Sequence, residues 1–338
     1  MPHRLLDAAS PAETGQAERF LALVAGPLAA TDRLFRERLA SDVPFIHHSG
    51  EYIFDGGGKR MRPALLLLCA QLLEREGDEE VTYAAVVELI HTATLIHDDI
   101  IDHAALRRGR RTLNELWGNN LTVLLGDWLY TTAMRMALAH GSVEVIDRLC
   151  EATLRMTEGE LLTQQRLGAA DLSVDEYFEI VDRKTAQLFA AACSVPARRR
   201  PARPDAIAPL ERYGRALGVC FQLADDLLDF TASAATVGKP VLSDLKEGKL
   251  TLPLLLLMPR VSTADRRSIE CVLEDRAFER ASADEILALV RREGTLEEVE
   301  ARAREFAVEA RAALAVFPEC EARRALEFAP DFVLHRRA

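Results

Sequence analysis

The sequence has few residues that bend or break helices, and few aromatic residues. Glycine (18) and proline (14) are sparse in a chain of 338 residues, and Phe, Trp and Tyr together make up only 6%. Sustained alternation of apolar and polar residues, which indicates half-buried strands, does not occur. Alanine, leucine, arginine and glutamate recur instead at helical spacing. We therefore predict an all-α protein with no sheet.

The six cysteines are scattered and form no CxxC pair, which argues against a disulfide framework or a zinc site. The first residues lack the apolar core of a secretory signal. The longest apolar runs, such as PALLLLCAQLL, are too short to cross a bilayer. We expect a cytoplasmic protein with reduced thiols and no stable membrane insertion.

Basic residues are outnumbered by acidic ones. The 42 Lys and Arg residues against 53 Asp and Glu give a formal net charge of -11. Nucleic acids and anionic membranes are attracted by a basic field, so this balance argues against both as partners. Part of the acidity belongs to the motif described below.

The periodicity predicts a single domain of about ten to thirteen helices, because no long linker divides the chain. Two of the expected helices, 79–103 and 205–234, are apolar over most of their circumference, which indicates central positions. The segment PARRRPARP at 196–204 is expected to be a solvated connection between helices. The predicted helices are 16–40, 59–76, 79–103, 114–140, 143–168, 173–194, 205–234, 248–259, 263–277, 283–293, 295–316 and 318–335.

An acidic motif, Asp-Asp-x-x-Asp, occurs twice within apolar helical segments. The first and last aspartates of each copy stack on one helix face, where like charges repel and need a compensating cation. Mg²⁺ fits this requirement, since it prefers oxygen ligands and usually shares them with substrate phosphates. One copy alone is more often a solvated acidic face, but two copies in apolar surroundings favour a metal site. The copies are Asp98, Asp99 and Asp102 in LIHDDIID, and Asp225, Asp226 and Asp229 in FQLADDLLD.

Positive charge gathers in short turns near these motifs, most of them marked by glycine. Glycine allows close approach of the backbone, while Lys and Arg bind phosphate through point charges or forked hydrogen bonds. Together with carboxylates and Mg²⁺, they describe a diphosphate site. The turns are GGKRMRP at 57–63, Arg107 and Arg108, RKT at 183–185, GKP at 238–240 and GKLTLP at 248–253.

These motifs resemble those of the trans-isoprenyl (polyprenyl) diphosphate synthase family. GGKRMRP, VELIHTATLIHDDIID, RRGRRT, GDWLY, RKTA, FQLADDLLDF, GKP and GKLTLP follow in that family's order over roughly residues 50–260. The resemblance implies the isoprenoid synthase fold, with helices around a central cavity. It also implies Mg²⁺-dependent condensation of isopentenyl diphosphate with an allylic diphosphate such as farnesyl or geranylgeranyl diphosphate, in a homodimer with one active site per chain.

The resemblance assigns roles residue by residue. Metal ligands would be Asp98, Asp102, Asp225 and Asp229, bridging to the allylic diphosphate. Basic residues that hold the same diphosphate would be Arg107, Lys184, Lys239 and Lys249. The diphosphate of isopentenyl diphosphate would be bound by Lys59, Arg62, His91 and Arg108. Thr185 and Gln222 would line the reacting centre, and the catalytic set as a whole would be Asp98, Asp99, Asp102, Lys184, Thr185, Gln222 and Asp225.

Product length would be measured along the helix that carries Asp98. Ala93 and Thr94 lie about one turn before it, where a bulky aromatic residue in the family stops growth early. Both are small, and the first motif is short, so we expect a long-chain product of the octaprenyl, solanesyl or decaprenyl type. Met134 and Met136 either form the floor of the tunnel or are ordinary core residues.

Three alternatives remain open. A geranylgeranyl or other shorter-chain synthase would share all these motifs and differ only in product length. A metal phosphohydrolase is suggested by His97 next to Asp98, but such sites use several histidines, and only His91, His97 and His103 lie near the motif. A non-catalytic partner subunit would have lost acidic or basic site residues, whereas both motifs are intact.

Overall fold

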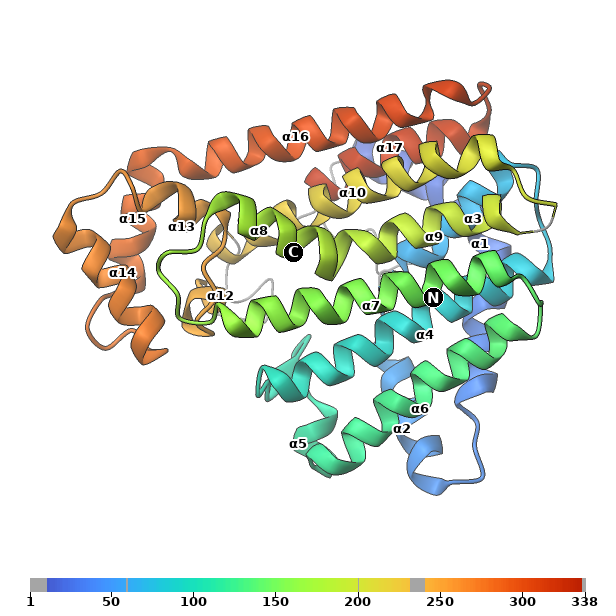
Figure 1. Ribbon diagram of the computed structural model, residues 1–338, viewed down its shortest axis with the longest axis horizontal. Helices are drawn as coiled ribbons and strands as arrows, with labels where there is room; N and C mark the ends of the chain where they lie inside the picture. Colours follow the sequence, from blue (N-terminus) through green and yellow to red (C-terminus); the bar gives the residue numbers. More distant parts are fainter. Residues whose placement is uncertain (1–10, 59, 200, 232–240, 336–338) are drawn as a thin grey trace.

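The computed structural model describes residues 11–58, 60–199, 201–231 and 241–335. Most of these residues are helical, and the long helices lie side by side along one axis (Figure 1), which confirms the all-α class. The principal helices are α1 (Pro11–Leu39), α2 (Pro44–Asp55), α3 (Met61–Leu72), α4 (Asp78–Ile101), α6 (Asn119–Leu138), α7 (Val143–Gln165), α8 (Val174–Val181), α9 (Gln187–Arg198), α10 (Pro204–Thr231), α14 (Thr263–Asp275), α15 (Ala283–Glu293), α16 (Thr295–Ala313) and α17 (Glu321–His335). Shorter segments are α5 (Leu113–Trp117), η2 (Asp182–Ala186), α12 (Ser243–Lys246), α13 (Leu252–Leu257) and η3 (Leu314–Val316).

Helices α4 and α10 lie at the centre, as their apolar sequences predict. In α4 every residue from Tyr83 to Ile90 is buried. In α10, two glycines let neighbouring backbone approach closely. A Cβ at Gly214 would lie 2.5 Å from the Phe189 carbonyl oxygen, and one at Gly218 would lie 2.6 Å from the Ala186 Cα. The segment η2–α9 is therefore packed directly against α10.

The apolar core divides into two clusters of buried side chains. One gathers around α3, α4, α6 and α9, and the other around α12 to α15. Both α10 and α16 contribute to the two clusters: Leu217 and Ala307 belong to the first, Leu223 and Val299 to the second. These two helices thus connect the halves of the molecule along its length (Figure 1).

The expectation of no sheet was wrong, although the correction is small. Leu106–Arg107 (β1) and Arg110–Arg111 (β2) form an antiparallel pair. The turn between them has φ of +53° at Arg108 and +73° at Gly109. Two consecutive positive φ angles are typical of the two-residue turn that suits a β-hairpin. The basic segment after the first aspartate motif is therefore an ordered hairpin.

Several predicted helix boundaries were also wrong. Helix α2 was missed, because its polar residues obscure the helical period. The predicted helix 114–140 breaks at Gly118, whose φ of +80° glycine adopts readily. The predicted helix 173–194 is three segments, with a π-helical turn at Asp182–Ala186. Within the predicted helix 248–259, the helical residues are those of the short α13, and α12 precedes it.

The expected solvated connection 196–204 begins within a helix. Helix α9 continues to Arg198, so Pro196 is helical. The Arg75 guanidinium donates to the carbonyls of Pro196 and Arg199, both at 2.7 Å. These carbonyls lie at the end of a helix, where the backbone has no helical partner, so an arginine satisfies them instead.

Candidate active site

The end of α4 carries the first aspartate motif in a crowded, partly buried place. The pKa of Asp98 is raised to about 6, because burial, together with Glu160 and Asp102, outweighs the opposing effects of Lys184 and Arg107. Asp102 follows the last helical residue, and its N–H donates to the Asp98 carbonyl at 2.8 Å. The two carboxylates therefore lie on one face, as the motif spacing predicts.

Lys249 joins this motif from the far part of the chain. Its Nζ lies 3.0 Å from Asp102 Oδ2 and 2.9 Å from Glu247 Oε2. Burial alone would lower the pKa of Lys249, but Asp102 and Glu247 outweigh it and raise the pKa. A charged lysine is thus held against the first motif.

Lys184 approaches the same place from η2. It forms an ion pair with Glu160 of α7, whose other carboxylate oxygen accepts from Gln164 at 2.9 Å. Burial tends to lower the pKa of Lys184, but Asp98 and Glu160 raise it overall. Gly159 makes this contact possible, since a Cβ there would lie 2.7 Å from the Lys184 backbone nitrogen.

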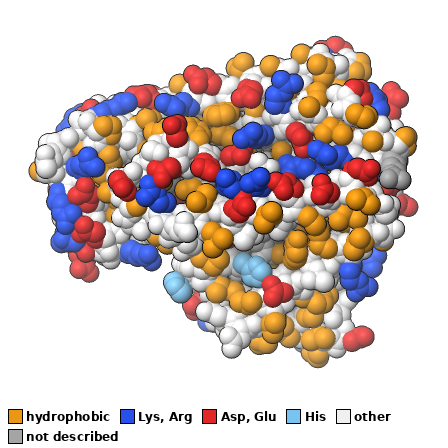
Figure 2. All heavy atoms as spheres, in the orientation of Figure 1, with side chains coloured by type: hydrophobic (Ala, Val, Ile, Leu, Met, Phe, Trp, Pro, Cys, Tyr) orange, Lys and Arg blue, Asp and Glu red, His pale blue; other side chains and the backbone are white. Residues whose placement is uncertain are grey.

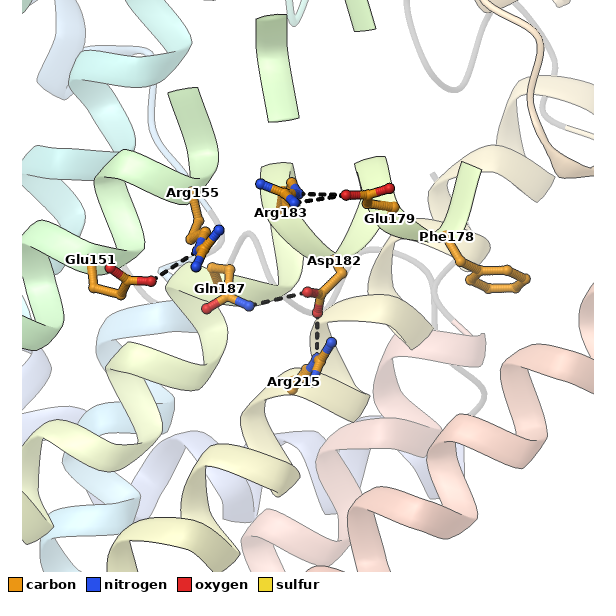
Figure 3. Close-up of a pocket in the computed structure, with 8 residues that line it drawn as sticks. All are labelled: Glu151, Arg155, Phe178, Glu179, Asp182, Arg183, Gln187 and Arg215. Carbon is orange, nitrogen blue, oxygen red and sulfur yellow. Dashed lines mark hydrogen bonds and ion pairs between the residues drawn. The ribbon is translucent and has the colours of Figure 1, made fainter. Parts of the chain in front are cut away.

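The other side of η2 is fixed by ion pairs around a pocket of about 590 Å³ (Figure 3). Asp182 accepts from Arg215 at 2.5 Å and from Gln187 at 3.2 Å. Arg183 pairs with Glu179 at 2.7 Å. These contacts hold the π-helical turn at both ends, so Lys184 and Thr185 have a defined position.

The three aspartates of the second motif differ in exposure and in hydrogen bonding. Asp225 is exposed on α10. Asp229 accepts from the Ser243 N–H at 2.9 Å and from its hydroxyl at 2.6 Å, which ties α10 to α12. Asp226 is buried, and its pKa is raised to about 7, because burial outweighs the hydrogen bonds from Tyr177 and Gln222, which lower it. The three aspartates thus differ in exposure: Asp225 is exposed, Asp229 is partly buried and Asp226 is buried.

The two residues predicted to line the reacting centre are brought together. Thr185 Oγ1 donates to Gln222 Oε1 at 2.9 Å. This contact joins η2 to α10, and it depends on the close approach at Gly218.

The predicted isopentenyl diphosphate site is strongly basic. Burial lowers the pKa of His91 well below its usual value, and Arg62, Arg108 and Arg107 lower it further. The imidazole is therefore neutral while guanidinium groups surround it. The Arg62 guanidinium carbon lies 4.4 Å from the centre of the Phe189 ring. Such a concentration of cations around a neutral histidine is suited to an anion.

The hairpin β1–β2 is anchored between the two predicted sites. Arg107 Nε donates to Asp99 Oδ1 at 2.7 Å, and Arg108 donates to the Gly57 carbonyl. The turn that begins the GGKRMRP motif thus lies next to the hairpin. Asp99, although part of the motif, is buried and holds Arg107.

The residues predicted to set product length lie inside the α4 helix. Ala93 is buried, and Thr94 is partly buried, with its hydroxyl donating to the His91 carbonyl at 2.8 Å. On α6, Met136 is buried and Met134 partly buried, both in the first core cluster. Two predicted site residues, Lys59 and Lys239, lie outside the described residues.

The donor set is consistent with Mg²⁺. Among the described residues, no three His, Cys, Asp or Glu side chains already form an arrangement for a metal ion. However, the carboxylates of Asp102 and Glu160 beside Asp98 make a locally negative place that a cation would relieve. Mg²⁺ commonly takes only one or two carboxylates together with substrate phosphates, so a preformed cage is not required.

The histidines near the motif do not converge. His97 Nε2 lies 3.5 Å from Asp127 and 3.2 Å from the Val123 carbonyl, towards α6. His103 is exposed, and His91 lies among arginines. This arrangement does not supply the several histidine ligands of a metal phosphohydrolase.

Three residues of the site were not predicted from the sequence. Glu160 and Tyr177 belong to none of the motifs, and Asp226 was recognised in its motif without a role. The only local signal was the position of Asp226 between two outward-facing aspartates. Glu160 contacts Lys184, and Tyr177 contacts Asp226, in each case from a different helical segment. Gln222 contacts Asp226 across one turn of α10.

Residues 43–290 match the sequence profile of the polyprenyl synthetase family. The chain belongs to this family. It is 40% identical over 309 residues to octaprenyl diphosphate synthase of Escherichia coli (strain K12), covering 91% of this chain and 95% of that one. The all-trans-nonaprenyl-diphosphate synthase (geranyl-diphosphate specific) of Rhodobacter capsulatus is 35% identical over 307 residues, covering 90% and 94% of the two chains.

The fold is shared with solved members of the family. The polyprenyl synthase from Caulobacter crescentus CB15, complexed with calcium and isoprenyl diphosphate, superposes with a TM-score of 0.90. It is 37% identical, and the match covers 95% of this chain and 98% of that one. The predicted family and isoprenoid synthase fold are therefore confirmed. None of the helices in the described part of the chain is long and apolar enough to cross a membrane.

Proposed function

We propose that this polyprenyl synthetase condenses isopentenyl diphosphate with an allylic diphosphate and releases a long-chain trans-polyprenyl diphosphate. The carrying observation is the convergence of Lys184 and Lys249 on Asp98 and Asp102, beside a separate basic site around His91. Each of the two anionic substrates needs a site of its own with basic residues. Octaprenyl and nonaprenyl synthases are among the relatives of this chain, which favours a long-chain product over geranylgeranyl diphosphate.

The allylic diphosphate would lie at the carboxylate site. Asp98, Asp102, Asp225 and Asp229 would hold Mg²⁺, and bound Mg²⁺ supplies the positive charge that neutralises the leaving diphosphate. Lys184, Lys249 and Arg107 would bind the diphosphate directly. In this step the ion pair of Lys184 with Glu160 would be replaced by contacts with phosphate oxygens. The ion pairs of Lys249 with Asp102 and Glu247 would be replaced in the same way. Lys239 of the GKP motif would add a further positive charge.

Isopentenyl diphosphate would occupy the second site. Arg62 and Arg108 would bind its phosphate oxygens, together with Lys59 of the GGKRMRP motif. His91, neutral among arginines, completes this site as a hydrogen-bond donor. The anchoring of the hairpin to Asp99 and Gly57 positions Arg107 for one site and Arg108 for the other.

The reaction follows from this arrangement. The C–O bond of the allylic diphosphate breaks, the diphosphate takes the electron pair, and an allylic cation remains. The double bond of isopentenyl diphosphate forms a new C–C bond to that cation, and a proton then passes to the released diphosphate. Thr185 and Gln222 stabilise positive charge through their oxygen dipoles, as preorganised groups do in the absence of bulk water.

Product sizing tests this function. Purified protein, farnesyl diphosphate, isopentenyl diphosphate and Mg²⁺ should give products longer than geranylgeranyl diphosphate, and chelation of Mg²⁺ should stop their formation. A product that ends at geranylgeranyl diphosphate would contradict the long-chain assignment. Phosphate release without isopentenyl diphosphate would favour a hydrolase. Activity that appears only with a second, different chain would indicate a modulating subunit.

We also propose that the chain forms a homodimer through α6 and α7. Apolar side chains collect on the face over these helices (Figure 2), and several are more than half exposed. Leu124 is 62% exposed and Leu154 56% exposed. Exposed apolar side chains gathered on one face favour an interface between chains.

Sedimentation measurements test the dimer. Leu124→Glu and Leu154→Glu place charges in the proposed interface and should yield monomers. Val316→Glu is a matched control, because Val316 is 67% exposed beyond the end of α16 and lies outside this face. Wild-type protein that sediments as a monomer would contradict the proposal.

The domain organisation and the location of the protein can also be inferred. We infer a single domain, because α10 and α16 contribute to both core clusters. We infer a cytoplasmic location from the scattered cysteines without CxxC pairs.

A further inference from the structure

A chain of hydrogen bonds continues from Thr185 and Gln222 into the protein. Gln222 Nε2 donates to Asp226 Oδ1 at 2.9 Å, and the Tyr177 hydroxyl donates to Asp226 Oδ2. Thr185, Asp226 and Tyr177 are each less than a tenth exposed. The four residues come from α8, η2 and α10, so the chain links three elements around one point.

Asp226 sets the direction of these hydrogen bonds. Asp226 accepts at both carboxylate oxygens, as an ionised carboxylate does, so Gln222 turns its NH₂ group towards Asp226 and its carbonyl oxygen towards Thr185. The single hydroxyl hydrogen of Thr185 is then used on Gln222. The Thr185 oxygen therefore presents lone pairs, rather than a hydrogen, to any other neighbour, which suits a place where positive charge develops.

We propose that Tyr177 and Asp226 are positioning residues that fix the amide of Gln222 and, through it, the polarity of the Thr185 hydroxyl. Tyr177 holds one carboxylate oxygen of Asp226 so that the other faces Gln222. The proposal rests on the proposed function, in which Thr185 and Gln222 line the reacting centre. It assigns Asp226 a role different from that of its neighbours Asp225 and Asp229.

A purely structural role for Tyr177 gives a different expectation. Its ring packs against Phe178 with centroids 5.3 Å apart, inside the second core cluster. Loss of its hydroxyl would then lower stability without changing turnover. The chain offers a matched control in Tyr213, which is fully buried and donates its hydroxyl to the Leu326 carbonyl at 2.7 Å.

Steady-state kinetics of Tyr177→Phe and Tyr213→Phe separate the two roles. In Tyr177→Phe we expect kcat to fall about tenfold, the effect of one hydrogen bond in the transition state. The KM values of both substrates and the Mg²⁺ concentration for half-maximal rate should stay within about twofold, because no substrate contact is lost. Tyr213→Phe should keep the wild-type kcat. Equal kcat in the two variants, or a raised KM alone for Tyr177→Phe, would overturn the proposal.

A double-mutant cycle identifies the route of the effect. Thr185→Val removes the hydroxyl at the end of this hydrogen-bond chain, so adding Tyr177→Phe to it should lower kcat by clearly less than Tyr177→Phe does alone, the remaining loss acting through Gln222. If the two substitutions lowered kcat by independent factors that multiply, Tyr177 would not act through Thr185 and the proposal would be overturned. A Thr185→Val variant with wild-type kcat would refute the role of Thr185 itself, and with that the proposed effect of Tyr177 and Asp226 on its hydroxyl. Inactive wild-type protein would instead refute the proposed function, so the failures are distinguishable.

Discussion

Lys249 Nζ lies 3.0 Å from Asp102 Oδ2, although the two residues are 147 positions apart. This ion pair joins the segment after the second aspartate motif to the end of the helix that carries the first. Both side chains are less than one-fifth exposed. The contact holds the Lys249 ammonium against a carboxylate of the first aspartate motif.

Replacement of Lys249 tests this relationship. Lys249→Gln should raise the KM for the allylic diphosphate by roughly tenfold to a hundredfold, since a hydrogen bond to a charged group contributes about 1.5–3 kcal/mol. Lys246→Gln, at an exposed lysine in α12, should leave this KM unchanged. Steady-state kinetics at saturating isopentenyl diphosphate measures both. Equal effects of the two variants would show that Lys249 does not contact the substrate.

Gly159→Ala should damage both stability and turnover. The new Cβ would lie 2.7 Å from the Lys184 nitrogen and 2.9 Å from the Arg183 Cβ, so η2 must move. Overpacking of this kind costs about 1–3 kcal/mol, and displacement of Lys184 should lower kcat at least about tenfold. Gly26→Ala is the control, because a Cβ there meets nothing within 4 Å. Thermal unfolding and kcat are the measurements.

Ala93→Phe should shorten the product. The new ring would occupy the volume about one turn before Asp98, where the growing chain is expected to pass. Ala93→Ser adds little volume and should leave product length unchanged. Chromatographic sizing of the prenyl products distinguishes shortening from a simple loss of activity. Wild-type length in Ala93→Phe would refute the assignment of this position.

His91 should make stability depend on pH. Its pKa is depressed in the folded protein, whereas the unfolded chain has a pKa near 6.5. Between these two values the unfolded state binds more protons, so the free energy of unfolding rises with pH and levels off above about 6.5. The contribution is at most about 1.4 kcal/mol per pH unit.

Denaturant unfolding from pH 5 to 8 measures this effect. His91→Gln should remove part of the pH dependence, because the glutamine side chain does not titrate. His140→Gln, at an exposed histidine, is the comparison variant. An identical dependence in wild type and His91→Gln would contradict a buried neutral imidazole.

The sequence predicted those features of the site that depend on neighbours along one helix. Asp98 and Asp102 lie on one face because four residues make about one helical turn, whatever surrounds them. The basic turns were recognised for a similar reason, since lysine, arginine and glycine next to one another already describe a phosphate contact. Residues 106–111 were recognised as basic, but their pairing into a hairpin depended on two positive φ angles.

Contacts between helices could not be predicted in this way. Glu160 and Lys184 are 24 positions apart, and Tyr177 and Asp226 are 49 positions apart. Neither pair has a local spacing that would indicate it. The first pair exists because Gly159 lets the backbone of η2 lie against α7.

The sequence by itself determined the helical class, the two carboxylate motifs and the diphosphate chemistry, because periodicity and local charge require no knowledge of the distant chain. Only the tertiary structure decided which cation meets which carboxylate, Lys249 with Asp102 and Lys184 with Glu160. It also decided that Asp226 is buried and accepts a hydrogen bond from Gln222, whereas Asp225 is exposed. Those outcomes depend on how closely helices approach, which is set by side-chain volume at their points of contact.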